Sequence, residues 1–211
     1  MKKFLAVLML IFSTSIMADP QAGNDYIQTA QAIPTDSADK IEVMEIFWYG
    51  CPHCYLFDPI LSAWVKKLPS DVYFKRVPGV PRQEWVPMAK AYYTLDALGL
   101  TDKLHSQLFD AIHKQKTLKP TDDAGTIDWI SKQAGLDKKK VEETYNSFST
   151  NTKVMRAMQI FRASGATGVP SLVIDGKFIT SSTMAGTNED SLKVADYIIS
   201  NIRKEKAAAK K

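Results

Sequence analysis

This sequence of 211 residues contains only two cysteines, Cys51 and Cys54, with two residues between them. One such pair cannot staple a chain of this size with disulfides, so the fold must rest on its own hydrophobic core. Unbalanced charge is also lacking, because 27 basic and 23 acidic residues leave a formal net charge of only +4. That near balance argues against a nucleic-acid-binding surface.

Long apolar runs are missing too, except at the N-terminus. The chain opens with MKKFLAVLMLIFSTSIMA, in which two lysines precede a mostly apolar run over 4–16 and Ala18 offers a small residue for cleavage. The run is shorter than the roughly 20 residues that span a bilayer. This arrangement is typical of a secretory signal peptide. We therefore expect residues 1–18 to be removed and the mature chain to be exported to a compartment where disulfides persist.

The apolar pattern of the mature part predicts one sheet. Residues 41–49 and 71–77 are short apolar runs that indicate strands, and the segment between them, from Pro52, has the spacing of a helix. Residues 171–180 form the clearest hairpin, two apolar runs about an Asp-Gly pair. The order of elements predicts an α/β fold, with helices flanking one sheet.

The segment between the second strand and the hairpin has only helical periodicity. Its expected helices begin at Thr or Asp and end at Gly, with Thr101 and Asp137 as caps and Gly99, Gly135 and Gly165 as stops. We therefore expect an all-helical insertion after the second strand. A last helix is expected from about residue 189.

The CPHC motif is compatible with four kinds of site. A c-type haem needs His directly after the second cysteine, where this chain has Tyr55. Zinc normally takes four ligands, which two thiolates and two distant histidines would supply only in an unusual geometry. A structural disulfide over so short a loop would constrain little of the unfolded chain. A redox pair between a strand and a helix, as in thioredoxin-like proteins, is the favoured interpretation.

The spacing of the motif has a physical logic. With Cys51 at the N-cap, Pro52 falls at the first helical position, where its missing N–H costs nothing. Free N–H groups and the helix dipole then favour a thiolate at Cys51, while Cys54 is shielded one turn further. Cys51 is therefore the predicted attacking thiol, Cys54 the resolving thiol and His53 a solvent-facing source of positive charge. The remaining histidines, at 105 and 113, are expected on the surface of the helical insertion.

The stretch EIFWYGCPHCYLF, the helical insertion after it and GVPSLV together resemble the DsbA family of exported thiol:disulfide interchange proteins. The resemblance implies a thioredoxin-like fold with an inserted all-helical domain. It implies that 19–80 and 166–204 form the thioredoxin-like part and that 81–165 form the insertion. The residues 205–211 themselves suggest a basic tail, the frayed end of a helix.

The same resemblance implies the activity and the partners. A family member donates its disulfide, here Cys51-Cys54, to reduced, unfolded exported proteins in the periplasm. It is reoxidised by DsbB, a quinone-linked membrane protein, so a DsbB-like partner is expected here. We expect a monomer that needs neither a cofactor nor a metal ion.

Further site residues follow from the resemblance. It implies a cis peptide bond between Val169 and Pro170. Because Val169 precedes a proline, its backbone is expected to be extended and to pair with a substrate strand. The alternative is that Pro170 simply opens a strand. Strand alternation puts Glu45 on an apolar face, and the resemblance implies that this acid lies beneath the dithiol beside a cation, Arg76. A charged Arg76 is expected to lower the pKa of Glu45, whereas an exposed acid at the end of a strand is the alternative.

Two other functions stay open at this point. The first is a disulfide isomerase or reductase of the same fold. Exported isomerases of this fold are expected to be dimers that associate through a separate N-terminal module. The roughly 20 residues between the signal peptide and the first strand are too few for such a module. The second is a non-redox peptide-binding chaperone, against which the two intact cysteines argue.

Overall fold

The computed structural model describes residues 19–209, so the predicted signal peptide, 1–18, and the last two residues of the predicted tail lie outside the described residues. In chain order the elements are β1 (Ile27–Gln28), β2 (Ile41–Phe47), α1 (Pro52–Val65), β3 (Val72–Pro78), the 3-10 helix η1 (Gln83–Trp85), α2 (Val86–Ala97), α3 (Thr101–His113), α4 (Asp123–Ala134), α5 (Lys138–Tyr145), α6 (Phe148–Ser164), β4 (Ser171–Ile174), β5 (Phe178–Thr180), α7 (Ser182–Ala185) and α8 (Asn188–Ala208).

The five strands of the sheet lie in the order β1-β5-β4-β2-β3. β2 pairs in parallel with β3 along its whole length and antiparallel with β4 on its other side. All seven residues of β2 are buried, as expected for a central strand with an almost continuous apolar run. The predicted hairpin is formed by β4 and β5, which three residues connect, and the turn residues Asp175 and Gly176 both have positive φ.

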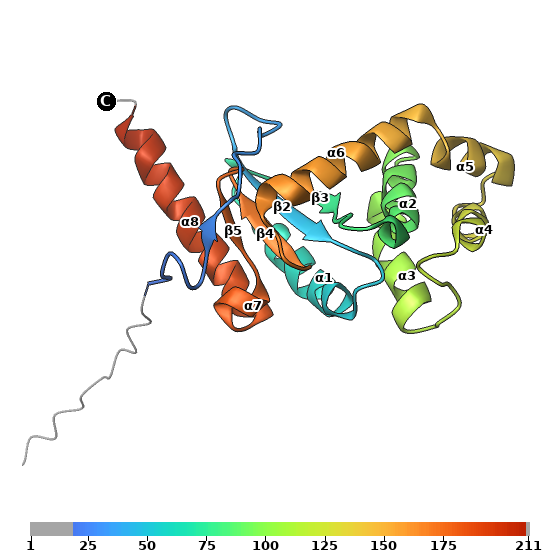
Figure 1. Ribbon diagram of the computed structural model, residues 1–211, viewed down its shortest axis with the longest axis horizontal. Coiled ribbons are helices and arrows are strands. Elements are labelled where there is room, and N and C mark those ends of the chain that lie inside the picture. The colour runs from blue at the N-terminus through green and yellow to red at the C-terminus, as the bar shows by residue number, and fades with distance from the viewer. Residues whose placement is uncertain (1–18, 210–211) are drawn as a thin grey trace, which may run out of the picture.

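Helices cover both faces of the sheet (Figure 1). On one face, Ile41 and Val43 of β2 share a hydrophobic cluster with buried residues of α1 and α8. On the other face, Met44 and Ile46 pack in a second cluster with Val154 and further residues of α6. The alternation of β2 residues between the two clusters follows from the side-chain period of a strand.

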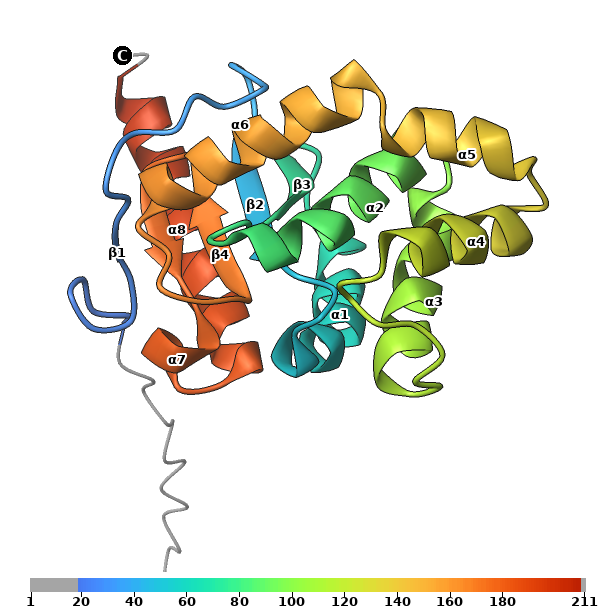
Figure 2. The same cartoon turned by 45° about the vertical axis from the view of Figure 1, so that its right-hand side comes forward.

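The helices α2 to α5 form a block beyond one end of the sheet, and α6 runs from this block back across the sheet (Figure 2). A third hydrophobic cluster fills the block and reaches the end of β2, where it includes Phe47, Tyr49, Cys51 and Cys54. The predicted α/β architecture with a helical insertion after the second long strand is confirmed. The dithiol therefore lies where the sheet and the helical block meet.

Several local predictions are confirmed and others are wrong. Asp137 caps α5 by accepting a hydrogen bond from the Lys140 N–H, and Gly135 ends α4 in the left-handed conformation. Thr101 is not a cap, because α3 begins at this residue with Leu100 as the N-cap and no side-chain capping bond. The predicted strand 41–49 ends two residues early, since the chain turns toward α1. The sequence missed β1 and α7, which are too short to show a period.

Candidate active site

The two cysteines lie at the start of α1. After β2 ends, three residues lead to Cys51, which is the N-cap of α1 with φ −90° and ψ 118°. Pro52 occupies the first helical position, and Cys54, one turn further, is fully buried. Both thiols are free, so the structure shows the dithiol form with Cys51 at the position that the spacing predicts.

Electrostatics distinguish the two thiols. The pKa of Cys51 is lowered to about 6, first by a hydrogen bond from the Cys54 thiol and then, against the raising effect of burial, by the N–H groups of Cys54 and His53 and the charge of His53. Burial raises the pKa of Cys54 well above its ordinary range, and the adjacent Cys51 raises it further. At neutral pH Cys51 is therefore mainly the nucleophilic thiolate, and Cys54 is a protonated thiol.

Residues that precede β4 face Cys51. The Cys51 sulfur lies 3.4 Å from the carbonyl oxygen of Val169, and the Val169–Pro170 peptide bond is cis, as the resemblance implies. A hollow of about 320 Å³ adjoins this contact; it is lined by His53, the Val169–Pro170 segment and several hydroxyl side chains, among them Thr183. The structure thus brings four predicted site residues, Cys51, His53, Val169 and Pro170, to one surface.

The turn before Cys51 is packed closely. The Trp48 ring stacks on Trp85 with 4.1 Å between ring centroids and 7° between planes. A side chain at Gly50 would collide with the Trp48 ring, so only glycine fits there. Periodicity in the sequence indicates no role for this turn, although the Gly directly before the first cysteine is a visible signal.

Glu45 and Arg76 are brought together, as predicted. Glu45 is 2% exposed on β2, and the Nε of Arg76, on the neighbouring β3, donates to its Oε2 at 2.9 Å. The predicted direction of the pKa shift is wrong, because burial raises the pKa of Glu45 to about 7. Arg76 cannot fully offset that burial, since its Nη2 also donates to Asp58 at 3.2 Å and the Asp58 charge itself raises the pKa of Glu45.

Asp58, which the sequence analysis missed, joins three elements under the dithiol. Its carboxylate, on α1, accepts from Arg76 of β3 and from Ser106 of α3 at 2.7 Å, and it lies 3.3 Å from the Nε2 of His105. Burial opposes ionisation, but the hydrogen bonds from His105 and Ser106 and the charge of Arg76 lower the pKa of Asp58 to about 2. Its position one helical turn after Cys54, on the same helix face, could have revealed it.

The two histidines of α3 are not surface residues, contrary to prediction. His105 is 5% exposed, and its Nδ1 lies 2.7 Å from the hydroxyl of Tyr49. His113 is partly buried, with its Nε2 2.7 Å from the carbonyl oxygen of Tyr49. The prediction failed because α3 packs against the turn before Cys51, a contact between distant parts of the chain that periodicity does not reveal.

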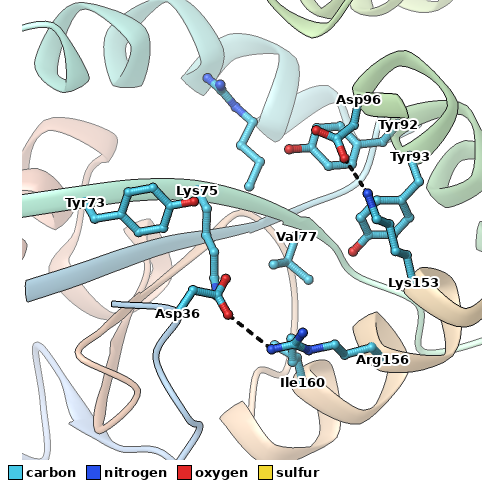
Figure 3. Close-up of a pocket in the computed structure, with 11 residues that line it drawn as sticks. Asp36, Tyr73, Lys75, Val77, Tyr92, Tyr93, Asp96, Lys153, Arg156 and Ile160 are labelled. Atoms are coloured by element: carbon cyan, nitrogen blue, oxygen red, sulfur yellow. Dashed lines mark hydrogen bonds and ion pairs between the residues drawn. The ribbon is translucent and has the colours of Figure 1, made fainter. Parts of the chain in front are cut away.

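A second hollow, of about 230 Å³, is lined by Tyr73, Lys75 and Val77 of β3 and by residues of α2 and α6 (Figure 3). Arg76 also lines it. Three ion pairs join its lining residues: Asp36 with Lys75 at 2.7 Å, Asp36 with Arg156 at 3.2 Å, and Asp96 with Lys153 at 2.7 Å. Because these charges pair with each other, the hollow has little to attract a charged ligand.

No group of three or more His, Cys, Asp or Glu side chains is placed to hold a metal ion among residues 19–209. Within the same range no helix is long and apolar enough to cross a bilayer.

A stabilised thiolate next to a shielded thiol can exchange its disulfide with the thiols of another molecule. Helices on both faces of a mixed sheet, with the dithiol at the start of α1, provide the setting for that exchange. The protein is a thiol:disulfide oxidoreductase of thioredoxin-like fold.

Comparisons with known proteins agree. Residues 76–193 match the family model described as a DSBA-like thioredoxin domain. The chain is 39% identical to the thiol:disulfide interchange protein DsbA of Pseudomonas aeruginosa over 95% of this chain and 93% of that one. It is 36% identical to DsbA of Burkholderia cepacia over 98% of this chain and all of that one.

Solved structures show the same likeness. The crystal structure of Pseudomonas aeruginosa DsbA superposes with a TM-score of 0.82 at 38% identity, covering 91% of this chain and 97% of that one. The oxidoreductase DsbA from Xylella fastidiosa superposes with a TM-score of 0.82 at 30% identity, covering 88% and 98%. The chain belongs to the DsbA family.

Proposed function

We propose that this protein is a dithiol oxidase of the periplasm, which donates its Cys51-Cys54 disulfide to reduced, unfolded exported proteins. The observation that carries the proposal is the contrast between the two thiols, with the pKa of Cys51 lowered to about 6 and that of Cys54 raised. A stabilised thiolate favours the reduced form, so the disulfide form is a good oxidant.

The reaction runs through a mixed disulfide. A substrate thiolate attacks the Cys51 sulfur, the Cys51-Cys54 bond breaks, and Cys54 leaves as a thiolate. Because burial raises the pKa of Cys54, it takes up a proton, which Glu45 can supply with its own pKa near 7. A second substrate thiolate then attacks the substrate sulfur of the mixed disulfide and releases Cys51 as a thiolate. Two substrate thiols have become a disulfide, and the enzyme disulfide has become a dithiol.

The substrate backbone is expected to bind beside the dithiol. A residue before a proline is biased toward an extended backbone, and the carbonyl oxygen of Val169 lies 3.4 Å from the Cys51 sulfur. Backbone pairing with a substrate strand at this residue would read no side chains, which suits a broad range of substrates.

The remaining assignments concern the cellular setting. We expect a signal peptide over 1–18, action as a monomer, and reoxidation by a DsbB-like membrane protein that passes electrons to a quinone. The support is the N-terminal sequence pattern and the family membership.

The test is stoichiometric oxidation of a reduced peptide that contains two cysteines. The oxidised protein should convert the peptide to its disulfide in a one-to-one ratio and end as the dithiol, whereas a Cys51→Ala variant should not react. An isomerase would instead rearrange a scrambled substrate faster than it oxidises a reduced one. A non-redox chaperone would slow substrate aggregation equally well with and without Cys51.

A further inference from the structure

The helix α3 contacts the segment just before the dithiol. The Nε2 of His113 lies 2.7 Å from the carbonyl oxygen of Tyr49, two residues before Cys51. A carbonyl oxygen can only accept, so the Nε2 of His113 carries the proton and donates it. This bond directs the Tyr49 carbonyl toward α3.

The same helix contacts the residue just after the dithiol. Tyr55 follows Cys54, and its hydroxyl donates to the Oδ1 of Asp110 at 2.9 Å. Its ring also stacks on the His113 ring, with 5.1 Å between centroids and 17° between planes. One histidine of α3 therefore touches both flanks of the CPHC motif, Tyr49 on one side and Tyr55 on the other.

A third contact anchors the side chain of Tyr49. Its hydroxyl lies 2.7 Å from the Nδ1 of His105, inside the core. Burial raises the pKa of Tyr49 well above its ordinary range and lowers the pKa of His105, so the hydroxyl keeps its proton and donates it to a neutral ring. The other ring nitrogen, Nε2, then carries a hydrogen that faces Asp58 of α1 at 3.3 Å.

These contacts matter for Cys51 because its thiolate depends on local geometry. Its pKa is lowered by the Cys54 thiol and by N–H groups of the first turn of α1, which act only while Cys51 stays at the N-cap. The turn that holds it there is short, with the Cys51 N–H bonded to the carbonyl of Trp48 at 3.0 Å. Fixing Tyr49 and Tyr55 therefore fixes both ends of the segment that carries the sulfur.

We propose that α3 holds the CPHC segment in its reactive geometry, with His113 and Asp110 as positioning residues for Cys51. The role rests on the proposed function of Cys51 as the attacking thiol. It gives the inserted helical block a part in the chemistry: the block supplies the donors and acceptors that keep the nucleophile at the helix N-terminus.

Three variants separate the elements of this role. His113→Phe keeps a ring to stack on Tyr55 but loses the donor to Tyr49, and His113→Gln keeps a donor but loses the ring. Lys114→Ala changes the exposed C-cap residue of α3, next to His113, and is the matched control. Two titratable groups act on Cys51, namely Cys54 and His53. Both lie on α1, and both are unchanged in all three variants.

The measurement is the pH titration of the thiolate of the reduced protein by its ultraviolet absorbance, together with the equilibrium constant against glutathione. His113→Phe should raise the pKa of Cys51 by at least about half a pH unit, roughly a threefold change in that equilibrium constant. His113→Gln should lie closer to the unmodified protein, and Lys114→Ala should match it. A lower melting temperature for His113→Phe with an unchanged thiolate titration would mean that His113 is only structural, and would overturn the proposal.

Tyr55→Phe provides a second test, which decides the matter if His113→Phe does not fold. It keeps the ring on His113 and removes only the hydroxyl bonded to Asp110, so a smaller rise in the pKa of Cys51 is expected. No rise in a folded Tyr55→Phe protein would then contradict the proposal. The titration needs no substrate, so its outcome is independent of whether the protein acts as an oxidase or as an isomerase.

Discussion

Replacing Glu45 by glutamine should change how stability depends on pH. Glu45 is buried beside one arginine that it shares with a second carboxylate, Asp58. Glutamine has nearly the shape of the protonated acid and can still accept a hydrogen bond from Arg76. The variant therefore represents the protein with Glu45 permanently neutral, and Asp58 remains as the ionised partner of the arginine.

The size of the effect follows from the shift in the pKa of Glu45. The folded protein has a pKa of about 7 for this group, against an ordinary value of 4.5. Because the folded pKa is raised, the protonated group contributes stability that is fully present below the unfolded value and is lost as pH rises through about 7. At about 1.4 kcal/mol per pH unit, that loss is roughly 3 kcal/mol. Glu45→Gln lacks this titration and does not lose that stability. Relative to the unmodified protein, its free energy of unfolding should therefore rise by roughly 3 kcal/mol between pH 4 and pH 8.

Urea unfolding of the reduced protein at several pH values measures this difference. Titration of Asp58 and of Cys51 is common to both proteins and cancels when their free energies of unfolding are subtracted. Glu143→Gln, on an exposed site of α5, is the matched control and should show no such pH dependence. A constant difference between Glu45→Gln and the unmodified protein would refute the raised pKa. A difference of the opposite slope would mean that Arg76 outweighs burial, as the sequence alone suggested.

Three other predictions follow from the site. Cys54→Ala should accumulate mixed disulfides with substrates on non-reducing gels, because no resolving thiol remains, and Cys51→Ala should accumulate almost none; equal trapping would contradict the assigned roles. The reduced protein should melt above the oxidised one at neutral pH, because the lowered pKa of Cys51 contributes stability that is lost as pH falls through about 6; an oxidised form that melts higher would argue against an oxidase. Arg76→Met should lower stability at neutral pH by roughly 3–5 kcal/mol, the usual cost of leaving a buried charge unpaired, and Glu45→Leu in the same chain should restore part of it. If the effects of the two single substitutions on the free energy of unfolding simply add in the double variant, the pair does not interact.

The elements that sequence predicted well are those determined by local pattern. The apolar run of β2, the Asp-Gly turn of the hairpin and the glycine at the end of α4 each follow from short-range physics. The position of Cys51 at the N-cap also follows locally, because Pro52 fits the first helical position and few others. These features needed no knowledge of how distant segments pack.

What sequence did not predict depends on contacts between distant segments. His105 and His113 look like ordinary polar residues of an amphipathic helix, and only the packing of α3 against α1 and the turn before Cys51 buries them. The prediction that the pKa of Glu45 is lowered was wrong for the same reason. Its pairing with Arg76 was predicted from register, but the sharing of Arg76 with a second carboxylate requires the three-dimensional structure.

The most direct test of the account is the reduction potential of the Cys51/Cys54 pair, measured by equilibration with glutathione. Lowering the pKa of the attacking thiol to about 6, against about 7 in thioredoxin, by itself raises the potential by about 30 mV. We therefore expect a value above the roughly −270 mV of thioredoxin, toward the roughly −120 mV that is known for a DsbA protein. A potential at or below that of thioredoxin would contradict the central claim, since the pair would then reduce disulfides rather than donate its own.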